Sequence, residues 1–449
     1  MAKYKNTKQI AKSVKKEISD SKLHKYLIAI PLLALLIKFI TMANIPAGGW
    51  YGADGENYTA GVDGLIKDGF FSTEPKLSYW PAGYPILLWP IAAITVSKFF
   101  YVVSFLQSVF FAFSTYFFTN KLRNSSLKYL AFWASILISF NPTLSLSSLA
   151  VGYEAPIASC FMMIAGVILA TFKEPLNKKF WIAVASVGGW FALATFMQPR
   201  FLLIAIIVAV MWAFKVVGTK NRIRIAALVT AIMMVAPTIM IYRNSVVIDK
   251  ATISTNLGVT MRIGAGPDTS GGYQRSGPEV PCDPVAPATT VSDNDIVKCV
   301  LKWYLANPVD TARLSINKAI FFWSTWSGPE VEGTMARNPW LKISPAHQIA
   351  KSSQAGRDFV YGPFGILVSW AWILGQMIFL FIGYRSLRKI GSDEKFFANI
   401  VAMPVVLSWL ISIGTIGDHR FRIPTMSMSI FLQVAAFLAI RKKLNEKIG

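Results

Sequence analysis

Two carboxylates lie two positions apart near the start of the chain, in the segment Asp54-Gly-Glu-Asn-Tyr58. A carboxylate can take a proton from an attacking hydroxyl group, so Asp54 and Glu56 are candidate general bases. In an extended loop both side chains would point the same way, so the residue types do not choose between them. The same acids would also suit an ordinary solvated loop.

A third acid, Glu154, lies immediately before a long apolar run. A carboxylate is costly next to hydrocarbon, so this residue is expected to have a partner or a catalytic task. The alternative is a capping role at a helix N-terminus, where a negative charge stabilises the first turn and Pro156 also fits.

A cluster of basic residues lies near the end of the chain, in Asp418-His-Arg-Phe-Arg-Ile-Pro424. Arginine binds phosphate oxygens through two parallel hydrogen bonds, so Arg420 and Arg422, with His419 beside them, are candidate phosphate ligands. The alternative is that they anchor a helix end to lipid head groups.

Cys282 and Cys299 lie 17 positions apart in one long polar segment, and they could form a disulfide if that segment is in an oxidising compartment. The sequence contains no zinc motif, phosphate-binding P-loop or dinucleotide fingerprint. No cofactor is therefore required, although a divalent metal would be compatible with the sequence. Energy must come from an activated substrate or from an ion gradient.

The composition predicts the elements that hold these residues. The chain of 449 residues is 54% hydrophobic and only 15% charged, whereas soluble domains average about 25% charged residues. Ten apolar runs approach the length that crosses a membrane. They are Tyr26–Ile45, Phe99–Thr119, Tyr129–Phe140 with its extension, Ala155–Phe172, Phe180–Phe196, Phe201–Val217, Ile225–Tyr242, Val360–Tyr384, Phe396–Ile416 and Ile423–Ile440. We therefore predict an all-α polytopic membrane protein.

An eleventh apolar run, 80–96, contains three prolines, which disfavour a continuous helix. If this run does not cross, six segments face the cytoplasm: the N-terminus, 120–128, 173–179, 215–224, 385–395 and 441–449. These segments hold 26 of the 45 Lys and Arg residues and only 6 of the 23 acids, as the positive-inside rule requires. We therefore expect a re-entrant or interfacial helix at 80–96 and both termini in the cytoplasm of a multi-pass cell-membrane protein.

This topology places all the acids and arginines named above outside the cytoplasm. We divide the chain into an N-terminal membrane region (1–245) with its first outer loop at 46–98, an outer cap (246–358) and a C-terminal membrane region (359–449). In the cap, 296–305 and 309–323 are predicted to be amphipathic helices split at Pro308. The net charge is +22, and the basic residues lie at the ends of the predicted spans. Nucleic acid is therefore not an expected partner, whereas membrane lipids are.

Four motifs occur in order on the predicted outer face. They are Asp54-Gly-x-x-Tyr58, Trp80-Pro-Ala-Gly-Tyr84-Pro85, Arg243-Asn244 followed by Ser254-Thr-Asn256-x-Gly258, and Arg420-Phe-Arg422-Ile-Pro424. In their order and in their predicted position on one side of the membrane, these motifs resemble those of the GT-C glycosyltransferases. The resemblance is in particular to bacterial relatives of the protein O-mannosyltransferases and of the lipid A aminoarabinose transferases. The resemblance covers nearly the whole chain, although each motif is weak alone.

The resemblance implies an enzyme that moves a hexose or pentose from a polyprenyl-phosphate carrier to a glycan, lipid or protein acceptor. Asp54 matches the first-loop catalytic base, and Glu154 matches an acid at the start of the fourth span. Arg420 and Arg422 match the motif near the carrier phosphate, with Arg243 and His419 as further candidates.

Tyr58, Tyr84, Asn256 and Arg200 are candidate substrate contacts. Arg200 departs from the family pattern, because Gln198-Pro199-Arg200 replaces the usual Arg-Pro. Ser427 stands where a second late proline is usual. Neither departure removes the proposed base, and the implied reaction inverts the configuration at the anomeric carbon.

Two other classes fit ten spans. A secondary transporter or lipid flippase should carry charges midway along several helices and an internal repeat. Lys38 is the clearest such charge, and no repeat is visible. An O-antigen polymerase or ligase would also carry a large outer loop, but the early Asp54 motif does not suit it.

Overall fold

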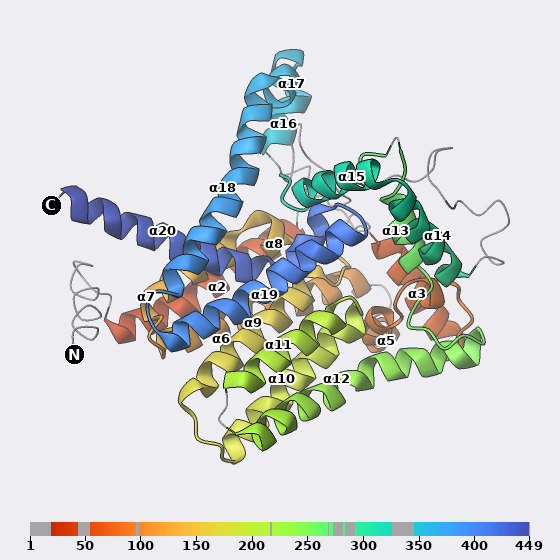
Figure 1. Cartoon of the computed structure of the whole chain (residues 1–449), viewed down its shortest axis with the longest axis horizontal. Coiled ribbons are helices and arrows are strands. Elements are labelled where there is room, and N and C mark those ends of the chain that lie inside the picture. Colours follow the sequence, from red (N-terminus) through yellow and green to blue (C-terminus); the bar gives the residue numbers. More distant parts are fainter. Residues whose placement is uncertain are drawn as a thin grey trace.

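The chain is almost entirely helical in a computed structural model, which describes residues 19–43, 54–95, 98–215, 218–267, 269–272, 282, 292–325 and 345–448. Those residues contain helices and turns and no β-sheet, which confirms the predicted all-α class. Long helices run roughly side by side through the body of the molecule, and shorter helices gather at one end (Figure 1).

All ten predicted apolar runs form helices. They are α2 (Asp20–Ala43), α6 (Phe99–Arg123), α7 (Lys128–Phe140) continued by α8 (Pro142–Leu146), α9 (Glu154–Ala170), α10 (Lys178–Met197), α11 (Phe201–Lys215), α12 (Thr219–Val247), α18 (Pro363–Leu387), α19 (Ser392–Gly414) and α20 (Met426–Ile448). Seven helical stretches are long and apolar enough to cross a membrane, or eight if the pair α7 and α8, bent by 56°, counts as one span.

The other two, α9 and α11, contain 17 and 15 residues and are shorter than an ordinary span. Fifteen of the 17 residues in α9 are buried, so this helix lies inside the bundle and contacts protein along its length. The eleventh apolar run forms α5 (Gly83–Thr95), whose 13 residues extend only about 20 Å. That length is too short to cross, as expected for a re-entrant or interfacial helix.

Charged contacts tie together the segments predicted to face the cytoplasm. Asp20, at the start of α2, pairs with Arg123 and Lys128 around the α6–α7 turn. Lys215, at the end of α11, pairs with Asp393 at the start of α19. The start of α2 and the end of α20 also lie at the same end of the bundle in Figure 1. The start of α2 and the end of α6 therefore lie on the same side of the bundle, so the segment between these two helices begins and ends on the other side. This arrangement requires that α5 does not add a crossing.

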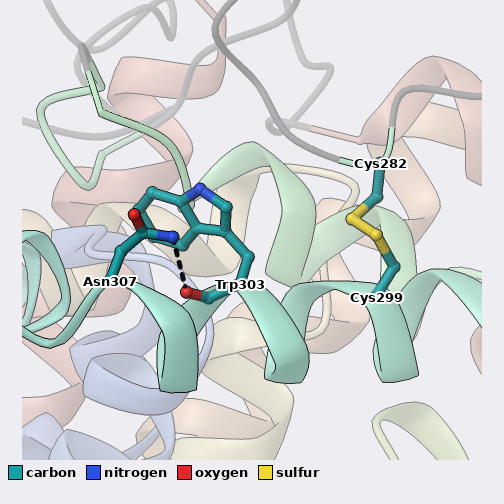
Figure 2. Close-up of a disulfide and its surroundings, with 4 residues drawn as sticks. All are labelled: Cys282, Cys299, Trp303 and Asn307. Atoms are coloured by element: carbon teal, nitrogen blue, oxygen red, sulfur yellow. Dashed lines mark hydrogen bonds between the residues drawn. A yellow bond between two sulfur atoms is a disulfide. The ribbon is translucent and has the colours of Figure 1, made fainter.

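The short helices form the opposite end, where α3 (Gly55–Asp68), α4 (Lys76–Tyr79), α13 (Leu257–Ile263), α14 (Asp293–Ala306) and α15 (Pro308–Phe321) lie. The break between α14 and α15 falls at Pro308, as predicted, because a proline fits the first turn of a helix but not its interior. The expected disulfide joins Cys282 to Cys299 of α14, and Asn307 closes that helix on the Trp303 carbonyl (Figure 2).

Two further helices, α16 (Pro345–Ser352) and α17 (Gln354–Tyr361), lie at the start of α18. Together they project from the body in Figure 1. Only 11% of the apolar window in this stretch is buried, so most of α18 faces the surroundings of the bundle.

Candidate functional site

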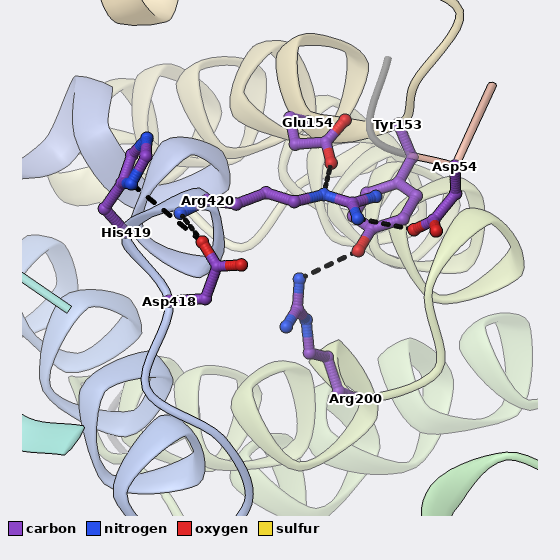
Figure 3. Close-up of polar contacts among 7 residues, drawn as sticks. All are labelled: Asp54, Tyr153, Glu154, Arg200, Asp418, His419 and Arg420. Carbon is purple, nitrogen blue, oxygen red and sulfur yellow. Dashed lines mark hydrogen bonds and ion pairs between the residues drawn. The ribbon is translucent and has the colours of Figure 1, made fainter. Parts of the chain in front are cut away.

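Arg420 joins two acids that lie far away in the sequence. Its Nη1 donates to Asp54 Oδ2, and its Nε donates to Glu154 Oε1, so one guanidinium forms two ion pairs (Figure 3). The side chains of Arg420 and Glu154 are both 5% exposed, whereas that of Asp54 is 15% exposed. Asp54 is therefore the member of this triad that a substrate can reach most easily.

Each member of the triad lies at the end of a helix. Asp54 precedes α3 but makes no capping hydrogen bond, so its carboxylate turns toward Arg420 instead. Glu154 is the first residue of α9, and Gly152 makes room for it, since a Cβ there would lie 2.5 Å from Glu154 Oε2. Arg420 lies in η6 (His419–Thr425), a 3₁₀ helix that Asp418 caps by accepting a hydrogen bond from the Arg420 backbone N–H.

Tyr153 lies between two arginines. Its ring centroid is 5.2 Å from the guanidinium carbon of Arg420 and 5.7 Å from that of Arg200. Arg200 also donates from Nη2 to the Tyr153 hydroxyl at 3.1 Å and stacks on Phe421, 4.0 Å from its ring centroid (Figure 3). Burial raises the pKa of Tyr153, so its hydroxyl stays neutral and can act as a hydrogen-bond donor. Arg200 is therefore part of the site, despite its departure from the expected sequence pattern.

Arg422 is buried but differs from Arg420 in its contacts. It is 2% exposed, and its guanidinium carbon lies 5.6 Å from the centroid of the Trp323 ring. Its Nε and Nη1 are buried and have no hydrogen-bond partner in the described part of the chain. A buried guanidinium without a counter-charge is costly, so its setting favours binding of an anion.

The two tyrosine candidates, Tyr58 and Tyr84, pack against each other. Tyr58 and Tyr84 are each 2% exposed, and their ring centroids lie 5.1 Å apart in an edge-to-face arrangement. Tyr58 also contacts Tyr153, and Tyr84 donates to Gln107 at 3.1 Å. Both side chains therefore shape the site through packing.

Glu56 does not share the position of Asp54. The predicted extended loop is wrong from Gly55 onward, because α3 begins there and places Glu56 on an exposed part of its first turn. Two residues along a helix are about 200° apart, so the two acids no longer point the same way.

Arg243, at the end of α12, is fully buried and occupied by protein groups. Its guanidinium donates to the backbone carbonyls of Phe70, Ser72 and Leu77 and to the Asn244 side chain. The arrangement fixes the segment between α3 and α4, and we therefore leave Arg243 out of the phosphate site.

Asn256 and His419 are the last two candidates from the sequence. Asn256 precedes α13 in the cap and accepts a hydrogen bond from Ser254 at 3.2 Å. His419 is buried beside Asp418, with 4.0 Å between Nδ1 and Oδ1. Over the described ranges, no group of three or more His, Cys, Asp or Glu side chains is arranged to hold a metal ion.

Sequence reasoning missed Tyr153 and Phe421 as members of the site. Tyr153 adjoins Glu154, and Phe421 lies between Arg420 and Arg422. An aromatic residue next to each charged candidate was a usable signal, because arginine stacks readily on aromatic rings.

No protein-family model and no curated protein matches this chain. Among solved structures, it is similar to the archaeal oligosaccharyltransferase AglB from Archaeoglobus fulgidus in complex with an inhibitory peptide and a dolichol-phosphate, with 13% identity and a TM-score of 0.49. The apo form of the Archaeoglobus fulgidus oligosaccharyltransferase gives 13% identity and a TM-score of 0.48. The alignments cover 94% of this chain but only 51% and 52% of those chains, so it spans about half their length. We therefore derive function from this chain's own residues.

Proposed function

We propose that the chain is a membrane glycosyltransferase that moves a hexose or pentose from a polyprenyl-phosphate carrier to an acceptor hydroxyl outside the cytoplasm. The observation that carries the proposal is the Asp54–Arg420–Glu154 triad, with Arg422 two residues from Arg420. Arg422 is buried, and its Nε and Nη1 have no hydrogen-bond partner in the described residues. A proton acceptor next to a phosphate-binding residue suits transfer of a sugar from a donor whose leaving group is a phosphate. A glycan, a lipid or a protein could supply the hydroxyl.

Asp54 is the proposed base. Its Oδ2 accepts from Arg420, and this contact fixes the orientation of the carboxylate. In the proposed step, the acceptor oxygen forms a bond to the anomeric carbon while its proton passes to Asp54. The bond from that carbon to the phosphate oxygen breaks, and polyprenyl phosphate leaves with the electron pair. This single displacement inverts the anomeric configuration, and general base help typically contributes about 10²–10⁴-fold to the rate.

Arg420 permits two acids to lie next to an anionic substrate. Asp54 and Glu154 alone would carry two negative charges and would repel the carrier phosphate. The guanidinium reduces the net charge of the triad to a single negative charge, and Glu154 holds it in position through the Nε contact. We assign Glu154 and Arg420 to orienting the base, which changes the expected role of Arg420 as a direct phosphate ligand.

Arg422 then becomes the principal phosphate ligand, and Arg200 provides a second cation beside the triad. Positive charge that is fixed before the reaction stabilises the charge that develops on the leaving oxygen. Arg200 approaches the triad through Tyr153. The predicted topology places the whole site on the extracytoplasmic face of the cell membrane.

Transfer from a purified donor tests this proposal. The protein in lipid nanodiscs would be incubated with polyprenyl-phosphate sugars and candidate acceptors identified by mass spectrometry of envelope glycans from cells with and without the gene. The expected result is a glycosylated acceptor and free polyprenyl phosphate in equal amounts, with inversion visible by NMR. Unchanged envelope glycans together with transport of a lipid or solute by the purified protein would overturn it.

A further inference from the structure

Lys38 lies within the membrane-spanning helix α2, near its C-terminal end, and is only 2% exposed. Its Nζ donates to Ser148 Oγ at 2.9 Å and lies 4.2 Å from the centroid of the Phe111 ring. The hydroxyl of Ser108 lies 3.0 Å from the same Ser148 oxygen. An ionisable side chain inside a membrane helix is costly and normally has a function. The contact with Ser148 shows which segment Lys38 acts on.

Ser148 lies in a buried break between two helices. It belongs to η2 (Ser147–Leu149), which follows the bent pair α7 and α8 and precedes α9. Every residue in the segment 147–153 is buried. Because this segment is not a continuous α-helix, its backbone carbonyls need hydrogen-bond donors from elsewhere in the protein.

Helix α6 supplies two of these donors. The Ser104 hydroxyl donates to the Leu149 carbonyl, and Gln107 Nε2 donates to the Ala150 carbonyl at 2.9 Å. Gln107 is itself held from the other side, because its Oε1 accepts from the Tyr84 hydroxyl at 3.1 Å. Residues three positions apart share one face of a helix, so a single face of α6 binds two successive carbonyls of the segment.

The segment 147–153 leads directly into the triad. Tyr153 is its last residue and lies between Arg420 and Arg200, and Glu154 follows it and binds Arg420. Only three residues separate Ala150 from Glu154, and each residue of an extended chain spans at most about 3.6 Å. A shift of the segment would therefore be passed on to both side chains.

We infer that Lys38 is a positioning residue, which fixes the segment 147–153 together with Ser104 and Gln107 and thereby sets the positions of Tyr153 and Glu154. The part of this inference that concerns sugar transfer rests on the proposed function. The inference also assigns a role to the charge that a transporter would place midway along a helix. The contacts of Lys38 that the described structure shows are internal to the protein and lead to the triad.

Hydrogen–deuterium exchange of the whole protein in nanodiscs tests the fixing of the segment without any substrate. Lys38→Met removes the donor and keeps an unbranched side chain of similar length. We expect the amides of 147–153 to exchange about tenfold faster, whereas those of α12 should keep their rates. Unchanged exchange in 147–153, or an equal increase throughout the protein, would overturn the inference.

Ser104→Ala tests the same segment if Lys38→Met does not fold, because it removes one donor and leaves Lys38 in place. Ser114→Ala is the matched control. Ser114 is also a buried serine of α6, but its hydroxyl bonds to carbonyls of α6 itself. Exchange in 147–153 should increase in Ser104→Ala and not in Ser114→Ala. Equal exchange in these two variants would contradict the inference.

Kinetics test the link from the segment to the triad. A shift of about 1 Å in a positioning group can cost about 10²-fold in rate, so Lys38→Met should lower kcat per folded molecule by about that factor. KM for the donor should change far less, because the proposed phosphate ligand Arg422 lies in η6. Ser114→Ala should keep the normal kcat. A purely structural role would lower the folded fraction and leave kcat per folded molecule unchanged, and that result would overturn the positioning role.

The outcomes separate the two proposals. Faster exchange in 147–153 of Lys38→Met, in a protein that transfers no sugar from any donor, would contradict the glycosyltransferase and support the fixing of the segment. Normal transfer by Lys38→Met with unchanged exchange would contradict the role of Lys38 and leave the enzyme intact.

Discussion

Arg420 forms an ion pair with Asp54, a residue 366 positions earlier in the chain, while the same guanidinium binds Glu154. The contact joins the segment between α2 and α3 to the turn between α19 and α20. It makes Arg420 an internal partner of the proposed base.

Replacing Asp54 by Asn should reduce transfer by about 10²-fold or more, because the amide cannot take the acceptor proton. The Asn carbonyl oxygen can still accept a hydrogen bond from Arg420, so carrier binding should remain nearly unchanged. Single-turnover rates and carrier Kd measure the two effects separately. Glu56→Gln is the matched control, because Glu56 is exposed in the first turn of α3. Loss of transfer in Glu56→Gln alone would move the base to Glu56.

Arg420→Met should destabilise the protein by about 3–5 kcal/mol, because it leaves two acids without their buried partner. Adding Glu154→Gln should recover part of that loss, since it removes one of the two unpaired charges. Neither variant should transfer sugar at more than a small fraction of the normal rate. Chemical denaturation in detergent gives the stability, and the donor assay gives the activity. Full activity in the double variant would show that the triad is structural only.

Gly152→Ala should displace Glu154, because the added Cβ would lie 2.5 Å from Glu154 Oε2. A shift of about 1 Å in a positioning group can cost about 10²-fold in rate, so kcat should fall while the folded fraction changes little. Gly189→Ala is the control, since a Cβ at Gly189 meets no atom within 4 Å. Similar kcat values for the two variants would mean that the position of Glu154 does not matter.

Arg243→Gln should lower the thermal unfolding temperature, because each buried hydrogen bond from a charged group contributes about 1.5–3 kcal/mol. In the fraction that folds, KM for the donor should stay within about twofold, since a phosphate ligand would show a larger change. A tenfold rise in KM without loss of stability would instead return Arg243 to the phosphate site.

Stability should rise with pH from about 7 to about 9 because of Lys318 in the cap. Burial lowers the pKa of its amine from 10.5 to about 7, and the amine donates to the Tyr304 hydroxyl at 2.8 Å. In this window the unfolded chain binds a proton that the folded chain does not, so stability increases by at most about 1.4 kcal/mol per pH unit. Burial also raises the pKa of Tyr304 to about 12, which keeps the tyrosine neutral throughout the window.

The midpoint of thermal unfolding, measured at pH 7, 8 and 9, checks this prediction. Lys318→Met should flatten the dependence. The same slope in both proteins would place the titrating group elsewhere.

The helices could be predicted because their signals are local. Apolar runs, the proline at 308 and the prolines in 80–96 each act within a few residues, and the corresponding helices appear at those positions. The charge asymmetry predicted which segments lie together, and Asp20 does pair with Arg123 and Lys128.

The partners within the site could not be predicted in the same way. Arg243 and Arg422 are both buried arginines. Backbone carbonyls accept hydrogen bonds from Arg243, whereas Nε and Nη1 of Arg422 have no hydrogen-bond partner in the described structure. Which environment each meets depends on how distant segments pack. Glu56 was misplaced for a local reason, because the extended loop expected after Asp54 is a helix.

The distance along the chain between Asp54 and Arg420 also has a consequence for biosynthesis. Translation proceeds from the N-terminus, so Asp54 and Glu154 are inserted and their helices can pack long before η6 emerges from the ribosome. Until then the carboxylates lack their ion-pair partner Arg420, and the partly made protein has neither the contact that orients the proposed base nor Arg422, the proposed phosphate ligand. A ribosome that stalls before residue 420 would therefore leave an inert membrane fragment rather than an unregulated transferase.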